Sequence, residues 1–138
     1  MPGRKKAVSS GRSLEEEVIE IARKLGLSVQ RQVRAGHRLW GRKRLIDVVL
    51  FDTRSGKSLG IECKAQETAG TTEEKLPATI HDIEAWPIPG IVVLSGKGFS
   101  EQMKSFAFST GKAVLLEELE DWLRLYFGLY EDRQHHFS

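Results

Sequence analysis

A single cysteine, Cys63, stands among the 138 residues of the chain, so no internal disulfide can form. No apolar run approaches the roughly 20 residues that a membrane-spanning helix needs. Residues 1–12 are basic and polar and lack the apolar centre of a secretory signal. These absences argue against disulfide-stapled secreted proteins and membrane proteins, and they predict a cytoplasmic, intracellular protein that does not interact with membranes.

Acidic residues are also missing from one stretch of the chain. The formal net charge is only +2, but residues 31–44 contain six Arg or Lys, together with His37, and no Asp or Glu. Residues 117–121 carry the opposite bias, with four acids. This uneven distribution indicates a positive face that binds a polyanion.

The length predicts one domain over residues 13–130, with a basic disordered arm at 1–12 and a frayed tail at 131–138. Ser13 is a suitable N-cap for an amphipathic helix that stops at Gly26. Strands are expected at 28–33, 45–51, 58–65, 90–96 and 112–116, and further helices at 71–86 (interrupted near Pro77), 100–110 and 117–130. This order predicts an α/β fold, in which helices cover both faces of a mixed sheet.

Three charged residues interrupt two of these strands, which are otherwise apolar. With Ser55-Gly56 as a two-residue turn, opposed residue numbers sum to 111, and Asp47 lies opposite Lys64 and diagonal to Glu62. All three then share one face, because side chains alternate along a strand. A three-residue turn would shift the register by one and separate Asp47 from the other two. The residues expected on the core face are Ile46, Val48, Leu50, Ile61 and Cys63.

Two carboxylates beside an amine have a chemical interpretation and a structural one. The acids can hold a hard divalent cation while the lysine acts on an attacking or developing oxygen, which suits phosphodiester hydrolysis. The alternative is a salt bridge across the hairpin, and for an isolated pattern of this kind that alternative is the more common case.

The context of the three residues favours the chemical interpretation. "IDVVLF" is followed, 15 residues after its Asp, by "ECK", with a capped helix upstream and a helix-strand pair downstream. In this the sequence resembles the PD-(D/E)XK nuclease superfamily, which includes restriction endonucleases, Holliday junction resolvases and small phage-borne nucleases. The resemblance implies a restriction endonuclease-like mixed sheet in α-β-β-β-α-β order. It also implies Asp47 and Glu62 as ligands of Mg²⁺, which Mn²⁺ can replace, and Lys64 as the catalytic lysine. Ile46 stands where the proline of the motif is expected.

Further site residues are suggested by the same resemblance. "GRSLEEEVIEIARKLG" matches the first helix of resolvase-like members and implies Glu15 as an additional acid, although a first-turn Glu also suits the helix dipole. Gln66 continues the face of Lys64 and is a candidate to orient water or phosphate. Lys75, at the start of a helix, is a candidate DNA contact, with a solvated lysine as the alternative.

The basic run precedes the strand that bears Asp47. A positive loop beside a metal site would hold the phosphate backbone of DNA, and an aromatic side chain within it can stack on or wedge between bases. The predicted DNA-binding residues of this run are Arg31, Arg34, Arg38, Trp40, Arg42, Lys43 and Arg44.

The sequence therefore predicts a metal-dependent DNA endonuclease that acts as a homodimer, with branched or distorted DNA preferred slightly to a specific duplex sequence. Its small size and family resemblance suggest that a phage or mobile element encodes it. Two alternatives from other classes stay open: a catalytically silent DNA-binding module of the same fold, and a structural subunit that associates through Phe127 and Tyr130.

Overall fold

The computed structural model describes residues 11–37, 43–66 and 74–129. Its elements follow the predicted order. The first helix begins at Gly11, so the last two residues of the predicted arm and the predicted N-cap Ser13 lie within this helix. The rest of the predicted arm, residues 1–10, and the predicted tail, residues 131–138, lie outside the described residues. The elements are α2 (Gly11–Lys24), β1 (Ser28–His37), β2 (Lys43–Phe51), β3 (Ser58–Ala65), α4 (Leu76–Glu84), β4 (Gly90–Ser95), α5 (Glu101–Ser109), β5 (Ala113–Leu115), a 3₁₀ turn (Leu116–Glu118) and α6 (Leu119–Phe127).

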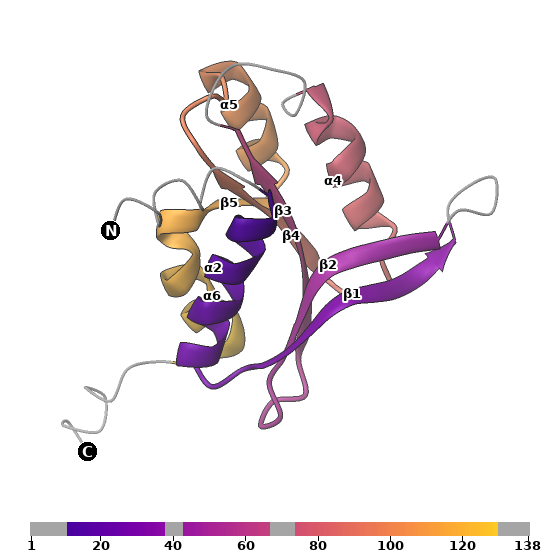
Figure 1. The fold of residues 1–138 in the computed structure, drawn as a ribbon, viewed down its shortest axis with the longest axis vertical. Helices are drawn as coiled ribbons and strands as arrows, with labels where there is room; N and C mark the ends of the chain where they lie inside the picture. The colour runs from indigo at the N-terminus through magenta and orange to yellow at the C-terminus, as the bar shows by residue number, and fades with distance from the viewer. Residues whose placement is uncertain (1–10, 38–42, 67–73, 130–138) are drawn as a thin grey trace.

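The five strands form one mixed sheet in the order β1-β2-β3-β4-β5 (Figure 1). The pairs β1-β2 and β2-β3 are antiparallel, whereas β3-β4 and β4-β5 are parallel. Every residue of β4 is buried, as expected for a parallel strand that helices cover on both faces. The predicted α/β fold with a restriction endonuclease-like sheet is thus confirmed.

A hydrophobic core lies on each face of the sheet. On one face α2 and α6 pack against the sheet through residues such as Leu14, Val18 and Leu123. On the other face α4 and α5 contribute Leu76, Ile80 and Ala107 to a second core. Figure 1 shows the two helix pairs on opposite sides of the strands. The sheet is therefore the middle of three layers.

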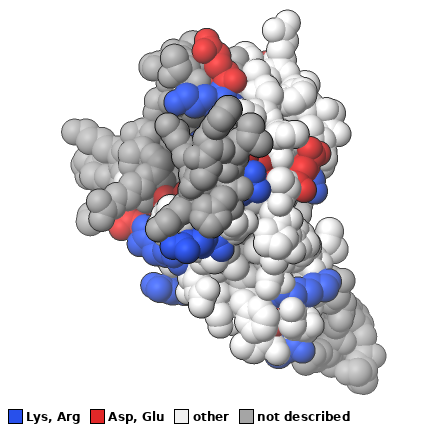
Figure 2. Space-filling view, turned by 90° about the vertical axis from the view of Figure 1, so that its right-hand side faces the viewer, with Lys and Arg blue, Asp and Glu red and all other residues white. Residues whose placement is uncertain are grey.

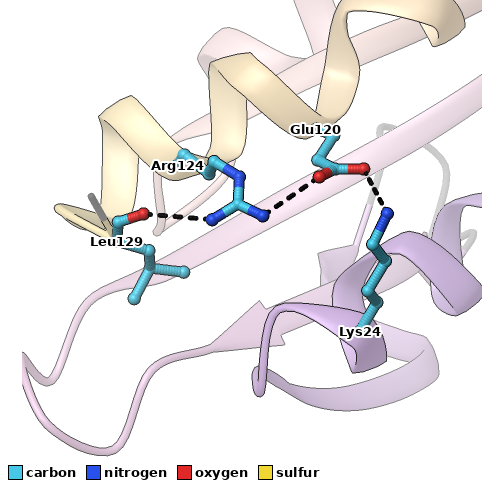
Figure 3. Close-up of polar contacts among 4 residues, drawn as sticks. All are labelled: Lys24, Glu120, Arg124 and Leu129. Atoms are coloured by element: carbon cyan, nitrogen blue, oxygen red, sulfur yellow. Dashed lines mark hydrogen bonds and ion pairs between the residues drawn. The ribbon is translucent and has the colours of Figure 1, made fainter. Parts of the chain in front are cut away.

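The first and last helices are joined at the surface by a small polar network (Figure 3). Lys24 Nζ of α2 lies 3.0 Å from Glu120 Oε1 of α6, and Arg124 donates to Glu120 Oε2 at 3.1 Å and to the Leu129 carbonyl at 3.4 Å. The hydrogen bonds from Lys24 and Arg124 lower the pKa of Glu120. Because Lys24 is exposed and Glu120 and Arg124 are only partly buried, burial of apolar side chains on α2 and α6 contributes more to this contact.

The helix pairing also corrects one expectation. Phe127 is only 4 % exposed and packs in the core with α2, so it offers no surface for a partner subunit. Tyr130 lies outside the described residues.

The β1-β2 hairpin changes its surroundings part-way along. Residues beyond Gln32, which has a φ of +51°, form what we call the distal hairpin, residues 33–37 and 43–46. Ile46 belongs to the core under α4, whereas Val48 and Leu50 belong to the core under α2. The prediction that Ile46 shares a core with Val48 was therefore wrong, because simple alternation assumes a regular strand and the pairing is interrupted at Gln32.

Within the described ranges, no helix has the length and apolar character that crossing a membrane requires.

Candidate active site

Asp47 lies at the point where β2 leaves β3. The β2-β3 ladder runs from Phe51↔Ser58 to Val48↔Ile61, and beyond it β2 continues with β1 alone. There the Asp47 side chain, and not a backbone carbonyl of β2, accepts the hydrogen bond from the Cys63 N–H, with 3.0 Å between the nitrogen and Oδ2. This bond fixes the carboxylate against β3, next to the backbone of Glu62 and Lys64.

The register of this hairpin differs from the predicted one by two residues. Opposed residue numbers sum to 109, not 111, because the strands are joined by a four-residue loop, residues 53–56. Asp52 stabilises the longer loop: Ser55 Oγ donates to its Oδ2 at 2.7 Å, and its backbone N–H donates to the Lys57 carbonyl. A shift of two residues preserves the face of each side chain. The pairing ends at Val48↔Ile61, so Asp47 has no opposed residue on β3 and the predicted pair of Asp47 with Lys64 does not form.

Glu62 and Lys64 point to the face of the sheet that carries α4. Both are half-buried, and both line one pocket of about 200 Å³ between β3 and α4. The alternate residues Ile61 and Cys63 pack in the core under α2, as predicted. The Glu62 Oε1 atom is buried. The ExK spacing thus presents an acid and an amine to one cavity.

The charges of four predicted site residues affect the pKa of Cys63. Burial raises the pKa of the Cys63 thiol above its ordinary value, and the negative charges of Asp47, Glu15 and Glu62 raise this pKa further, while Lys64 opposes them. These four groups come from three elements, α2, β2 and β3. The raised pKa keeps the thiol protonated, in agreement with its prediction as a core residue.

Glu15 is held by an ion pair. Arg31 Nη2 of β1 lies 3.2 Å from Glu15 Oε1 of α2, and the Glu15 side chain is the more buried of the two. Arg31 was predicted as a DNA contact, and in this structure its described contact is with Glu15. The catalytic role of Glu15 and the DNA-binding role of Arg31 stay predictions.

Gln66 forms hydrogen bonds that hold the end of β3 in place. Its Nε2 donates to the Gly98 carbonyl at 3.0 Å, and its backbone pairs with Ser95 and Gly98. The side chain is buried, so it joins β3 to the loop between β4 and α5. Its predicted catalytic role remains a prediction.

The basic residues divide into described and undescribed ones. Arg34 is exposed on β1, and Arg44 Nε lies 3.8 Å from Asp82 Oδ1 of α4. Lys75, the N-cap residue of α4, is exposed and lines the same pocket as Glu62 and Lys64. Figure 2 faces the side on which the hairpin projects in Figure 1, and it shows Lys and Arg side chains next to the grey residues at the centre of the view. Arg38, Trp40 and Arg42 lie outside the described residues, as does the side chain of Lys43.

The donor set is compatible with a magnesium ion. In the described part of the chain, no three His, Cys, Asp or Glu side chains are grouped so that they could hold a metal. Mg²⁺ needs fewer protein ligands, because it is usually bound through one or two carboxylates and completes its shell with water and phosphate oxygens. Asp47 keeps Oδ1 without a hydrogen-bond partner among the described residues, so this oxygen is available to a hard cation.

Comparison with known proteins decides the family. A model described as a PD-(D/E)XK nuclease superfamily domain matches residues 6–118. The chain belongs to the PD-(D/E)XK nuclease superfamily. No curated protein matches this PD-(D/E)XK chain significantly.

Two solved structures are similar to this PD-(D/E)XK chain. One is the protein of unknown function AF1548, with a TM-score of 0.52 and 21% identity over 74% of this chain and 55% of the other. The second is a repair endonuclease from Pyrococcus abyssi, with a TM-score of 0.45 and 15% identity over 77% of this chain and 45% of the other. The first supports the fold alone, and the chain spans about half the length of both structures.

Sequence reasoning missed the contribution of α4 to the PD-(D/E)XK site. Thr79, Asp82 and Trp86 line the pocket that contains Glu62 and Lys64. Their spacing of three to four residues, with Trp86 just past the helix end, was a signal that they share one face of the helix. No sequence pattern indicated that this face of the helix meets β3.

Proposed function

We propose that this chain is a metal-dependent DNA endonuclease that hydrolyses phosphodiester bonds. The observation that carries the proposal is the hydrogen bond from Cys63 N–H to Asp47 Oδ2, since it holds the first acid against the strand segment that bears Glu62 and Lys64. Membership of the PD-(D/E)XK superfamily supports the same chemistry. In this proposal Asp47 and Glu62 hold Mg²⁺, and Mn²⁺ can take its place.

The roles of the side chains follow from their charges. A bound divalent ion would lower the pKa of water and neutralise phosphate charge. In this proposal the Lys64 ammonium polarises the attacking water and stabilises the negative charge that develops on the phosphate oxygens. Water adds to phosphorus, the bond from phosphorus to the leaving sugar oxygen breaks, and that oxygen takes a proton. Glu15 is a candidate to accept the proton of the water.

DNA is the proposed substrate because of the charge distribution. Arg44 lies on β2 and Lys75 at the start of α4, two elements that line the pocket, while Arg34 lies opposite Leu45 on the neighbouring strand β1. The basic stretch continues between β1 and β2. Such residues neutralise backbone phosphates without reading sequence. We favour branched or distorted DNA over a specific duplex sequence, and we propose a homodimer, because one chain offers one candidate site and two strands must be cut.

Cleavage assays test the proposal. Supercoiled plasmid and a four-way junction are each incubated with the protein and either Mg²⁺ or EDTA. We expect cleavage only with the metal, and a loss of about 100-fold or more in Lys64→Ala. Lys57→Ala is the matched control, because Lys57 lies seven residues earlier, roughly 23 Å along the strand at ~3.3 Å per residue.

The outcomes separate the candidate functions. Cleavage that persists in EDTA or in Lys64→Ala contradicts the proposed mechanism. DNA binding without cleavage under any of these conditions indicates the catalytically silent binding module. Sedimentation of the protein with and without DNA tests the proposed dimer.

A further inference from the structure

The pocket beside Glu62 and Lys64 is larger than a metal ion and its waters require. Its volume is about 200 Å³, and its lining is about equally polar and apolar. The less polar part is formed by Leu45 of β2 together with Ala78, Thr79 and Trp86 of α4 and the following turn. A cavity of about 150 Å³ is known to accommodate benzene. This pocket therefore has room for a planar aromatic ring next to the proposed catalytic groups.

Trp86 provides a buried donor at this pocket. Its side chain is 8% exposed, and its Nε1 is buried without a hydrogen-bond partner among the described residues. The indole is anchored by its six-membered ring, whose Cε3 and Cζ3 atoms lie over Gly60 and Gly90. Nε1 belongs to the five-membered ring of the indole, which is not the ring that packs over the two glycines, and it can therefore donate a hydrogen bond to a ligand. A buried N–H without an acceptor is costly, which favours a ligand that supplies one.

Arg44 provides a second donor of this kind. Its Nε is buried without a hydrogen-bond partner in the described chain, because Asp82 Oδ1 at 3.8 Å is beyond hydrogen-bond distance. Asp82 itself lines the pocket. Two buried nitrogen donors therefore lie in or beside one cavity, whose lining combines apolar side chains with the charged groups of Glu62 and Lys64. A ring that bears hydrogen-bond acceptors matches this combination.

We propose that this pocket binds one unpaired nucleobase of a DNA strand, next to the phosphate that is cut. The inference rests on the proposed nuclease function, since that function places a DNA phosphate at Glu62 and Lys64. All four bases carry carbonyl or ring-nitrogen acceptors, so the pocket selects an unstacked base without reading a sequence. Lys75, at the rim, is placed to contact a phosphate of the same strand. Unpaired bases enter such pockets at the lowest cost, because they need not leave a base pair.

Binding measurements without catalysis test this inference. The probes are two DNA duplexes with one extra nucleotide, which is either a normal unpaired nucleotide or an abasic analogue. Anisotropy in EDTA is expected to show about tenfold tighter binding of the probe that keeps its base. Ala78→Phe fills the pocket and is expected to abolish this preference. His81→Phe adds the same side chain at an exposed position of α4 outside the pocket lining and is expected to retain it.

A milder variant tests the role of the donor. Trp86→Phe keeps an aromatic ring over Gly60 and Gly90 but lacks the indole N–H, so the preference is expected to fall while thermal melts show a folded protein. Equal affinity of the native protein for both probes overturns the inference. If the native protein cleaves DNA but shows equal affinities, only the base pocket is wrong. If it prefers the probe with a base but never cleaves, the nuclease proposal is wrong and the pocket stands.

Discussion

Asp47 is predicted to have two separable functions, and two substitutions distinguish them. Its carboxylate accepts the hydrogen bond from Cys63 N–H at 3.0 Å, and in our proposal it also binds the metal ion. Asp47→Asn retains an oxygen that can accept the hydrogen bond but removes the negative charge. Asp47→Ala removes both.

The expected losses of stability follow from this difference. In Asp47→Ala the Cys63 N–H is left without its acceptor at a residue that is only 7 % exposed, which costs about 1–3 kcal/mol. For a chain of this length that free energy lowers Tm by roughly 3–9 °C. Asp47→Asn is expected to stay close to the native Tm, because the acceptor is kept and the amide occupies nearly the same volume.

Cleavage and thermal unfolding are measured side by side. Both variants are expected to lose about 100-fold or more in Mg²⁺-dependent cleavage, since a neutral side chain at this position is a poor ligand of a hard cation. Native cleavage by Asp47→Asn would refute the metal-binding role. An unchanged Tm in Asp47→Ala would refute the structural role of the hydrogen bond.

Two further predictions concern the loops that frame the strands. Gly96→Ala places a Cβ 2.1 Å from the Gln66 carbonyl oxygen at a φ of +110°, so urea unfolding is expected to show a loss of about 2 kcal/mol or more in the free energy of unfolding. The control is Gly111→Ala, at a positive φ but in open space, which is expected to lose only about 1 kcal/mol. Equal losses in the two variants would argue against the close contact at Gly96. The hydrogen bond from Ser55 is the main cause of the lowered pKa of Asp52. The stabilisation by this carboxylate is therefore present above its unfolded-state pKa and is lost as the pH falls through the folded-state pKa. Ser55→Ala is expected to raise the Asp52 pKa in an NMR titration, and an unchanged pKa would contradict this cause.

The sequence was sufficient to predict the element order and the shared face of Glu62 and Lys64. Periodicity identified all five strands, and the parity of a β-strand assigned Glu62 and Lys64 to one face whatever the turn. The register was wrong by two residues because Ser55-Gly56 looked like a complete turn. The Asp52 side chain stabilises a longer loop, and this depends on contacts that form only in the folded hairpin.

Two other features depend on tertiary contacts. The separation of Ile46 from Val48 arises from the interruption at Gln32, whose positive φ no sequence rule assigns to a glutamine in a strand. The pocket beneath α4 forms only if the Trp86 indole can pack directly against the sheet. Gly60 and Gly90 provide it on two neighbouring strands, and their adjacency is a property of the strand order.

The indole of Trp86 also fixes how α4 is attached to the sheet. A side chain at either Gly60 or Gly90 would come within 3.0 Å of the ring, so the two strands form a slot that admits the indole only because both lack a Cβ. The helix is thereby anchored at its carboxyl end, while Lys75 and Ala78 near its amino end remain solvent-accessible. Substitutions at those exposed positions can alter ligand preference without loosening the anchor, which makes the amino end of α4 the natural starting point for redesigning specificity.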